Sequence, residues 1–260
     1  MSAHGDEGFE KMTDVVVTVI IPAYRAEAYL RQSLESALRQ ELPCEILIVD
    51  DCSPDGTGAL ADRLEDEHPE QVQVIHNQQN LGVAESRNIA IRMARGRYIA
   101  FLDADDWWAD GKLKKQVSLL EESGCVLCCT GRELMNPDGS SMQKTIGVPD
   151  RISYQMILKT NLISCSSVLI RREVAQEFEM THDELHEDYI LWLKTLKKYG
   201  DACGIDEPLL KSRLSDGGKS RNKLKSAKMQ FGVYRLMGFG FFRSCFYFVQ
   251  YAVNGFRKYH

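Results

Sequence analysis

Apolar runs and amphipathic segments alternate along the first hundred residues of the chain. The apolar runs are rich in β-branched residues, as expected for strands buried on both faces of a sheet, and they cover residues 15–21, 45–49, 72–75 and 98–102. Between them, apolar residues recur at helical spacing, at Leu30 to Leu38, Leu60 to Leu64 and Ala84 to Ala94. This order predicts an α/β fold with a mostly parallel sheet, right-handed crossovers and helices on both faces.

The second half of the chain predicts further elements and a tail. We expect strands at residues 125–130, 166–172, 202–205 and 208–213, with helices near 113–120, 154–158 and 187–196. Asn136 to Gly139, with the sequence NPDG, is typical of a hairpin turn, so the sheet becomes mixed there. The predicted organisation is a flexible leader at 1–13, a catalytic domain at 14–214 and a basic, aromatic helical tail at 215–260.

Carboxylates follow two of the predicted strands. Asp50 and Asp51 end the second, and Asp103, Asp105 and Asp106 end the fourth. Because ligands bind outside the carboxyl ends of parallel strands, we expect these acids to meet at one edge. If the chain stays extended there, Asp103 and Asp105 point to the same side. Oxygen ligands suit Mg²⁺ or Mn²⁺, so the pair indicates a divalent cation site shared with a substrate phosphate.

Composition limits the possible partners and compartments. The 260 residues are 44% hydrophobic and carry a net charge of −5, which gives no indication of nucleic-acid binding. Residues 211–260 hold eleven Lys or Arg and one acid, whereas the first 210 residues carry −15. The eight cysteines lack framework spacing and no signal peptide is evident, which favours a reducing cytoplasm. Cys125 and Cys128 form a C-x-x-C, and we expect two buried thiols there rather than zinc or redox chemistry.

Five segments together resemble family 2 glycosyltransferases of the GT-A fold, which has a Rossmann-like, mostly parallel sheet. The segments are IPAYRAEAYL, IVDDCSPDGT, NLGVAESRNIAI, GRYIAFLDADD and HEDYILWL, in this order between residues 15 and 214. The resemblance implies transfer of a sugar from a nucleotide diphosphate donor with inversion at the anomeric carbon. The Q-x-x-R-W element of processive members is missing, so polymer synthesis is not expected.

The resemblance also implies roles for individual residues. Asp51 resembles the carboxylate that accepts a hydrogen bond from uracil, Asp103 resembles the ribose contact, and Asp105 resembles the direct ligand of the ion. Arg87 matches a position that contacts the base or the phosphates, although an arginine on a helix surface is the simpler interpretation. The predicted nucleotide-sugar-binding set is Pro22, Ala23, Tyr24, Glu27, Asp51, Gly82, Arg87, Asp103 and Ala104. Arg25 stands where the family usually has Asn.

The chemistry requires a base as well as a cation. An acceptor hydroxyl must lose its proton as it attacks, which calls for a positioned carboxylate. Asp188 is the candidate base by its match to the family's E-D pair, and Glu187 is its neighbour, which orients the acceptor or the structure. The simpler alternative is that both acids only favour the N-terminus of a helix through its dipole.

Two other motifs are weaker. His182 and His186 are four residues apart, but the second position of an H-E-x-x-H zinc motif is Asp183 here. The segment DGGKS, which ends at Ser220, lacks the first glycine of a phosphate-binding P-loop. It more resembles the family's loop that folds over the diphosphate, where Lys219 or Arg221 would contact phosphate.

The tail combines basic residues with the aromatic stretch from Gly238 to Phe256, which Arg243, Gln250 and Asn254 interrupt. This pattern favours an interfacial membrane helix over a transmembrane span. A helix packed on the catalytic domain, or on a second copy in a homodimer, is the alternative.

We therefore expect a metal-assisted, inverting hexosyltransferase at the inner face of the cell membrane that uses a UDP-sugar and a lipid-linked or surface-polysaccharide acceptor. The alternatives are a nucleotidyltransferase that makes a sugar nucleotide, which would need a glycine-rich basic N-terminal loop, and a non-catalytic, membrane-bound sugar-nucleotide sensor.

Overall fold

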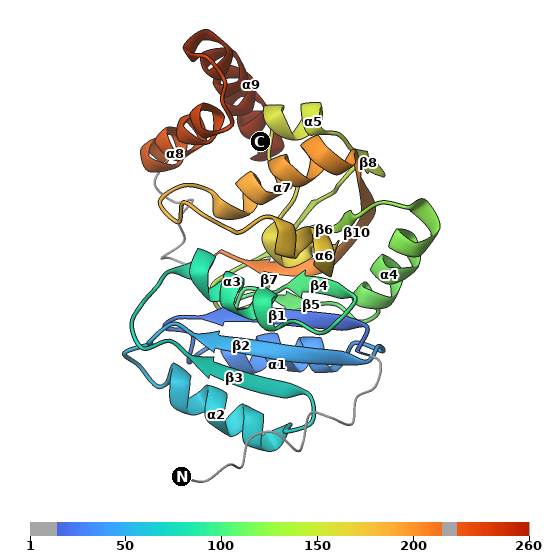
Figure 1. Cartoon of the computed structure of the whole chain (residues 1–260), viewed down its shortest axis with the longest axis vertical. Helices are drawn as coiled ribbons and strands as arrows, with labels where there is room; N and C mark the ends of the chain where they lie inside the picture. The colour runs from blue at the N-terminus through green and yellow to red at the C-terminus, as the bar shows by residue number, and fades with distance from the viewer. Residues whose placement is uncertain (1–14, 215–222, 260) are drawn as a thin grey trace.

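A computed structural model describes residues 15–214 and 223–259, and its strands form one mixed sheet in the order β3-β2-β1-β4-β9-β6-β10-β5 (Figure 1). The strands are β1 (Val17–Ala23), β2 (Cys44–Asp50), β3 (Val72–His76), β4 (Tyr98–Phe101), β5 (Trp107–Trp108), β6 (Leu127–Met135), β7 (Ser141–Ile146), β8 (Arg151–Ile152), β9 (Leu169–Arg171) and β10 (Ala202–Arg213). The helices are α1 (Leu30–Leu38), α2 (Thr57–Glu67), α3 (Val83–Met93), α4 (Lys112–Ser123), α5 (Tyr154–Lys159), α6 (Arg172–Glu177), α7 (Glu187–Tyr199), α8 (Lys223–Leu236) and α9 (Phe241–Tyr259).

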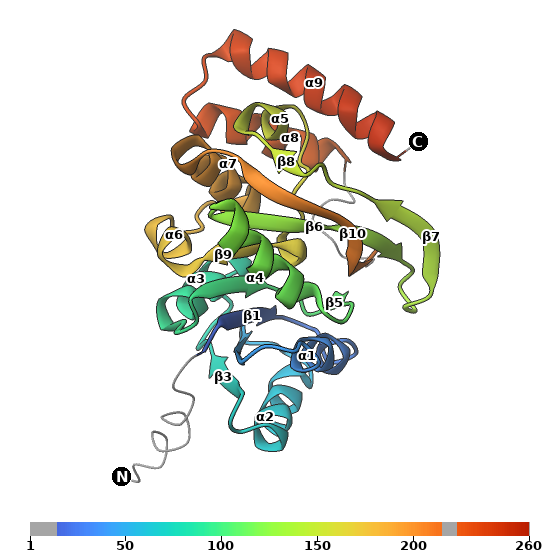
Figure 2. The ribbon, with the colours of Figure 1, turned by 90° about the vertical axis from the view of Figure 1, so that its right-hand side faces the viewer.

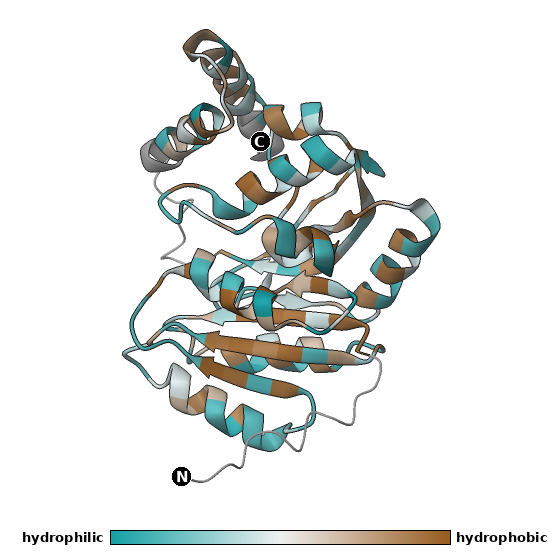
Figure 3. Ribbon diagram, viewed as in Figure 1, coloured by the Kyte–Doolittle hydropathy of each residue, from teal (hydrophilic) through white to brown (hydrophobic). Residues whose placement is uncertain are grey.

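The predicted parallel half of the sheet is confirmed. Strands β3, β2, β1 and β4 are parallel neighbours. Alternate side chains of β1 enter two different cores, because successive residues of a strand point to opposite faces. Val19 and Ile21 pack in the core that α1, α2 and α4 cover, and Ile20 packs in the core that includes α3 and α7. These strands are apolar along most of their length (Figure 3), so burial on both faces explains their unbroken hydrophobic runs.

The first strand extends beyond the predicted run of residues 15–21 and includes Pro22. Pro22 lies inside β1 and pairs in register with Val49 of β2. The carbonyl of Ile20 accepts a hydrogen bond from the amide of Leu102, so the backbone groups of Ile20 face the β4 side. Pro22 lies two residues later in the strand, and its backbone groups face the same side. Because β4 ends at Phe101, no ladder hydrogen bond is lost when residue 22 has no N–H.

The second half of the sheet differs in detail from the expected strands. The β6–β7 hairpin forms around the predicted turn, where Gly139 donates to the carbonyl of Asn136. The two strands expected at 202–205 and 208–213 are one strand, β10, whose pairing with β6 is irregular between Ile205 and Leu210. The strand expected at 166–172 is shorter: Ser166 and Ser167 belong to a 3₁₀ turn, Cys165–Ser167, and only Leu169–Arg171 form the strand, β9.

The cysteine prediction is wrong for one member of the C-x-x-C. Cys125 forms a disulfide with Cys203, joining the N-terminal ends of the neighbouring strands β6 and β10. Cys128 is a buried thiol, as expected. The pairing crosses 78 residues, which explains why local spacing did not reveal it. The scattered spacing is therefore no argument for a reducing compartment.

The described part of the C-terminal tail forms the helices α8 and α9, as expected, and lies at the end of the molecule opposite α2 (Figure 1). In the view of Figure 2, α9 is the outermost element at that end. It packs on α5 and α8, where Tyr247 donates to Gln155 and its ring lies 5.9 Å from that of Tyr234. Across the described helices, none combines the length and apolarity that crossing a bilayer requires.

Candidate active site

The acids after β4 lie in a tight turn rather than in extended chain, which corrects the premise that Asp103 and Asp105 share one side by strand alternation. The amide of Asp106 donates to the carbonyl of Asp103 over 3.0 Å. Asp106 is buried, and its carboxylate accepts the amide of Arg213 at 2.9 Å. Burial, and then the nearby charges of Asp103 and Asp105, raise the pKa of Asp106 well above its ordinary value. The turn therefore concentrates negative charge at one point.

Arg87 of α3 connects this turn to the start of α7. Its two terminal nitrogens bind Asp103 at 2.6 Å and Glu187 at 2.8 Å. The guanidinium is almost completely buried, and so is the Glu187 carboxylate, whereas the Asp103 side chain keeps 36% of its surface exposed. A buried arginine held by two carboxylates is a strong, directional contact. It brings together the end of β4 and the E-D pair, which are more than 80 residues apart in sequence.

Asp188 has the environment of a base. It follows Glu187 in the first turn of α7, and its carboxylate accepts the amide of Tyr189 at 2.7 Å. Burial, and next the charge of Glu187, raise the pKa of Asp188 to about 7, while Arg87 lowers it. A carboxylate that titrates near the working pH suits proton transfer better than one with an ordinary pKa.

The residues after β1 and β2 line the same edge. The amide of Asp51 donates to the carbonyl of Ala23 at 2.9 Å, so the two strand ends are adjacent. Pro22, Ala23 and Ala104 are buried, whereas Tyr24 is 45% exposed. Glu27 is exposed, and its carboxylate accepts the amide of Gly56 at 3.1 Å, which ties it to the loop before α2.

Asp51 holds the loop before α3. Its carboxylate accepts the side chain of Asn77 and the amides of Leu81 and Gly82, all within 2.9 Å. Gly82 has a φ of +86°, which residues other than glycine rarely adopt. A Cβ atom at this position would also meet the Asp183 carboxylate at 2.6 Å. Asp51 and Gly82 therefore set the N-terminus of α3, the helix that carries Arg87.

Sequence reasoning missed the residues that hold the acidic turn in place. Arg213, the last residue of β10, donates to the carbonyls of Asp105 and Pro137 at 3.0 and 2.7 Å and to the side chain of Gln32 at 2.7 Å. Its guanidinium also lies over the rings of Tyr29 and Trp107, at 4.7 and 4.9 Å from the ring centres.

Ser166 was also missed, because the sequence assigned it to a strand. Its hydroxyl accepts the amide of Asp103 at 3.1 Å, and its carbonyl accepts the indole N–H of Trp108 at 2.7 Å. The neighbouring Cys165 is buried. Burial, and also the nearby carboxylates, raise the pKa of its thiol well above the ordinary value. We therefore expect the thiol to remain neutral.

The acidic turn offers carboxylates of the kind that a divalent ion shared with a substrate would use. Within residues 15–214 and 223–259, no group of three or more His, Cys, Asp or Glu is arranged to hold a metal ion by itself. Mg²⁺ is usually held by one or two carboxylates and completed by phosphates and water. Asp103 is partly exposed, and the charges of Asp103 and Asp105 are close enough to act on Asp106. Two neighbouring carboxylates of this kind match such a site.

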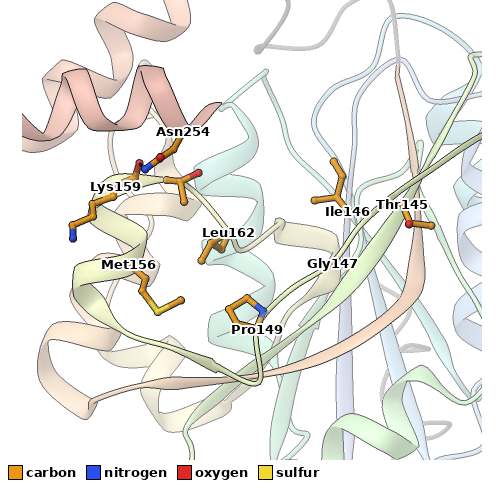
Figure 4. A pocket seen from close by; sticks show the side chains of 9 residues that line it. Thr145, Ile146, Gly147, Pro149, Met156, Lys159, Leu162 and Asn254 are labelled. Carbon is orange, nitrogen blue, oxygen red and sulfur yellow. Dashed lines mark hydrogen bonds between the residues drawn. The ribbon is translucent and has the colours of Figure 1, made fainter. Parts of the chain in front are cut away.

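Some of the predicted features lie elsewhere or outside the described residues. His182 contacts Glu184 at 2.8 Å in the loop before α7, where the zinc motif had been considered. The loop with Lys219 and Arg221 falls outside the described residues. An open cavity of about 640 Å³ lies between β7, α5 and α9 (Figure 4), lined in part by Met156, Leu162 and Asn254. None of the predicted site residues lines this cavity.

Arg25 gives a first testable prediction. Its φ of +53° lies in the left-handed region, which Asn tolerates better than Arg. We expect Arg25→Asn to raise the free energy of unfolding by about 0.5–1 kcal/mol, which corresponds to about 2 °C in Tm. Thermal unfolding measures this. Arg39→Asn, at a residue with φ −76°, is the control and should give no gain; a lower Tm for Arg25→Asn would contradict the strain argument.

Comparison with known proteins identifies a nucleotide-sugar-dependent glycosyltransferase. The chain belongs to glycosyl transferase family 2, whose family model matches residues 18–178. It is 39% identical over 245 residues to the putative teichuronic acid biosynthesis glycosyltransferase TuaG of Bacillus subtilis, covering 94% of this chain and 97% of that protein. It is 32% identical over 252 residues to WfgD of Escherichia coli, a UDP-Glc:α-D-GlcNAc-diphosphoundecaprenol β-1,3-glucosyltransferase, covering 95% and 96%.

Solved structures share the fold. TarS of S. aureus in complex with UDP-GlcNAc matches with a TM-score of 0.67 and 19% identity, over 85% of this chain and 66% of that one. The mannosyltransferase PcManGT of Pyrobaculum calidifontis in complex with GDP-Man and Mn²⁺ matches with a TM-score of 0.68 and 18% identity, over 88% and 66%. The expected GT-A type of mostly parallel sheet flanked by helices is thereby confirmed.

Proposed function

We propose that this protein transfers one sugar from a UDP-sugar to a hydroxyl of a lipid-linked or surface-polysaccharide precursor, with inversion, at the inner face of the cell membrane. The observation that carries the proposal is the buried bridge of Arg87 to Asp103 and Glu187. It holds the donor-side acids and the candidate base in one cluster. The names of two relatives, which refer to teichuronic acid biosynthesis and to a diphosphoundecaprenol acceptor, support the acceptor class.

The proposed reaction is a single displacement. Asp188 takes the proton of the acceptor hydroxyl, the acceptor oxygen forms a bond to the anomeric carbon, and the bond from that carbon to the diphosphate breaks. The electron pair leaves with UDP. Because attack and departure occur on opposite faces of the sugar, the configuration inverts. A raised pKa for Asp188 of about 7 allows it to accept the proton at neutral pH and release it afterwards.

Asp103 and Asp105 would hold the divalent ion, Mn²⁺ or Mg²⁺. When bound, such an ion neutralises the charge that develops on the leaving diphosphate. The predicted donor contacts are Tyr24 and Asp51 toward the nucleoside, with Pro22, Ala23, Ala104, Gly82 and Glu27 shaping the surrounding loops. In this proposal Arg87 acts through Asp103 and Glu187, which it already binds.

A panel of nucleotide sugars with Mn²⁺ tests the proposal. We expect one UDP-sugar to raise Tm and to be hydrolysed slowly without acceptor, because a ligand that binds only the folded state stabilises it. If no nucleotide sugar protects the protein, the proposal fails. Protection by a nucleoside triphosphate with release of pyrophosphate would instead support the nucleotidyltransferase alternative, and protection without any turnover would support a sensor.

Asp105→Asn tests the cation ligand. The neutral amide is a poorer ligand for a hard cation, so we expect UDP with Mn²⁺ to give little or no rise in Tm for this variant. The carbonyl of Asp105, which Arg213 binds, is unchanged by the substitution. Asp110→Asn, at an exposed acid nearby, is the matched control and should behave like the parent protein. Undiminished Mn²⁺-dependent protection of Asp105→Asn would remove Asp105 from the site.

A further inference from the structure

One face of α9 is exposed and strongly apolar. Phe242, Phe246, Val249 and Val253 follow one another at spacings of four, three and four residues, which places them in a single stripe along the helix. All four are exposed, and Phe242 keeps 87% of its surface accessible. Exposed apolar side chains are ordinary when they occur singly, but a continuous aromatic and aliphatic stripe indicates an interaction surface.

The opposite face of α9 attaches it firmly to the catalytic domain. Ser244 and Tyr247 are buried there, and Asn254 donates to the carbonyl of Lys159 at 3.1 Å. Farther along, the rings of Tyr251 and Tyr189 lie 6.4 Å apart. The helix is therefore an amphipathic element with one face already used for folding and the other still uncovered.

The charge of the C-terminal segment matches an anionic surface. Residues 217–260 contain nine Lys or Arg and neither Asp nor Glu. Of these, Lys228, Arg235 and Arg243 are exposed on α8 and α9. Basic residues beside an aromatic apolar stripe are typical of helices that lie in the interface of an anionic membrane. A second copy of the chain would bring the same positive charge against itself, which disfavours a dimer through this face.

The packing also connects this face to the candidate base. Tyr189, which follows Asp188, donates to the carbonyl of Ile157 in α5. Tyr234 of α8 donates to the next carbonyl, that of Leu158, at 2.7 Å. These contacts join α7 and α8 to α5, and α9 also packs on α5 and on Tyr189. The exposed stripe therefore keeps a fixed position relative to Asp188.

We propose that the stripe formed by Phe242, Phe246, Val249 and Val253 lies in the headgroup region of an anionic bilayer and holds Asp188 at a fixed height above it. This inference rests on the proposed function and adds a selection rule. An acceptor hydroxyl reaches Asp188 when its own lipid is anchored in the same bilayer. Confinement to one surface then raises the effective concentration of the acceptor at the base.

Vesicle sedimentation tests the surface. The double variant Phe242→Ser with Phe246→Ser should bind vesicles of phosphatidylethanolamine and phosphatidylglycerol about a hundredfold more weakly, since each lost phenylalanine removes about tenfold. The parent protein should bind these vesicles and bind phosphatidylcholine vesicles much less. A matched control is Met93→Ser with Met142→Ser, which removes exposed apolar side chains on α3 and β7. Equal sedimentation of both double variants would overturn the proposal, and so would a parent dimer that the α9 substitutions dissociate.

Activity with two acceptors tests the selection rule. One acceptor is a GlcNAc-diphosphate lipid in the vesicles, and the other carries the same head on a short, water-soluble alkyl chain. The α9 double variant should lose about tenfold or more of its turnover with the vesicle acceptor and keep it with the soluble one. An equal loss with both acceptors would overturn the rule. If the parent protein uses neither acceptor, a GlcNAc-diphosphate lipid is ruled out as its acceptor, and the sedimentation result still decides the role of α9.

Discussion

Asp188→Asn is expected to lower kcat by about 10²–10⁴-fold, the range that a positioned general base contributes. The amide has nearly the shape of the carboxylate but cannot accept the acceptor's proton. The substitution leaves Asp51, Asp103 and Asp105 unchanged, so the rise in Tm with UDP and Mn²⁺ should stay as in the parent protein. Steady-state kinetics and thermal unfolding on one preparation separate the two effects. Unchanged turnover would remove Asp188 as the base.

The raised pKa of Asp188 also predicts how turnover depends on pH. A base acts in its deprotonated form, so turnover of the parent protein should fall about tenfold per pH unit below the Asp188 pKa of about 7 and level off above it. In Asp188→Asn this limb should be absent from the residual rate. Asp201→Asn, an exposed acid just beyond the other end of α7, is the control and should keep the limb.

Stability should move in the opposite direction to activity. The folded-state pKa of Asp188, about 7, lies above its ordinary value of 3.8, so the folded protein binds the proton more tightly between these pH values. The contribution of Asp188 to stability therefore falls as pH rises from about 4 to about 7. Above pH 7, Asp188→Asn should be at least as stable as the parent protein. A loss of activity with an unchanged or higher Tm would then exclude unfolding as the cause.

Much of the fold could be predicted because the strands are buried on both faces and therefore appear as uninterrupted apolar runs. The order of strands and helices then fixes which loops share an edge. This is why the segments that end in Ala23, Asp51 and Asp103 were expected together, and the hydrogen bond between Asp51 and Ala23 agrees with that expectation. Family 2 membership was likewise carried by short motifs at these strand ends.

The rest depends on contacts that no local pattern reveals. Arg87 lies in a predicted helix among polar residues, yet its partners Asp103 and Glu187 are 16 and 100 residues away in sequence. Arg213 acts through carbonyls of the acidic turn 108 residues earlier and a turn 76 residues earlier. The acids were considered as extended chain after the strand that ends at residue 102, but the hydrogen bond from Asp106 to Asp103 closes them into a turn. The sequence DADD at residues 103–106 does not by itself distinguish extended chain from a turn.

Arg87→Ala is expected to destabilise the protein by about 3–5 kcal/mol, because it removes the arginine charge that lies 2.8 Å from the buried Glu187 carboxylate. Most of the loss should come from Glu187, which is buried, and less from Asp103, whose exposed side chain water can solvate. Urea unfolding measures the change. Arg92→Ala on the same helix removes an exposed pair with Glu85 and should cost less than about 1 kcal/mol.

A double substitution shows whether the loss arises from the unpaired charge. If it does, Arg87→Met combined with Glu187→Leu should be more stable than Arg87→Ala alone, since two apolar side chains replace a broken ion pair. Turnover should stay low in both variants, because neither holds Asp103 and α7 together. A cost below about 1 kcal/mol for Arg87→Ala would mean that water reaches Glu187. The bridge would then be a surface contact, and the link between the acidic turn and the base would need another cause.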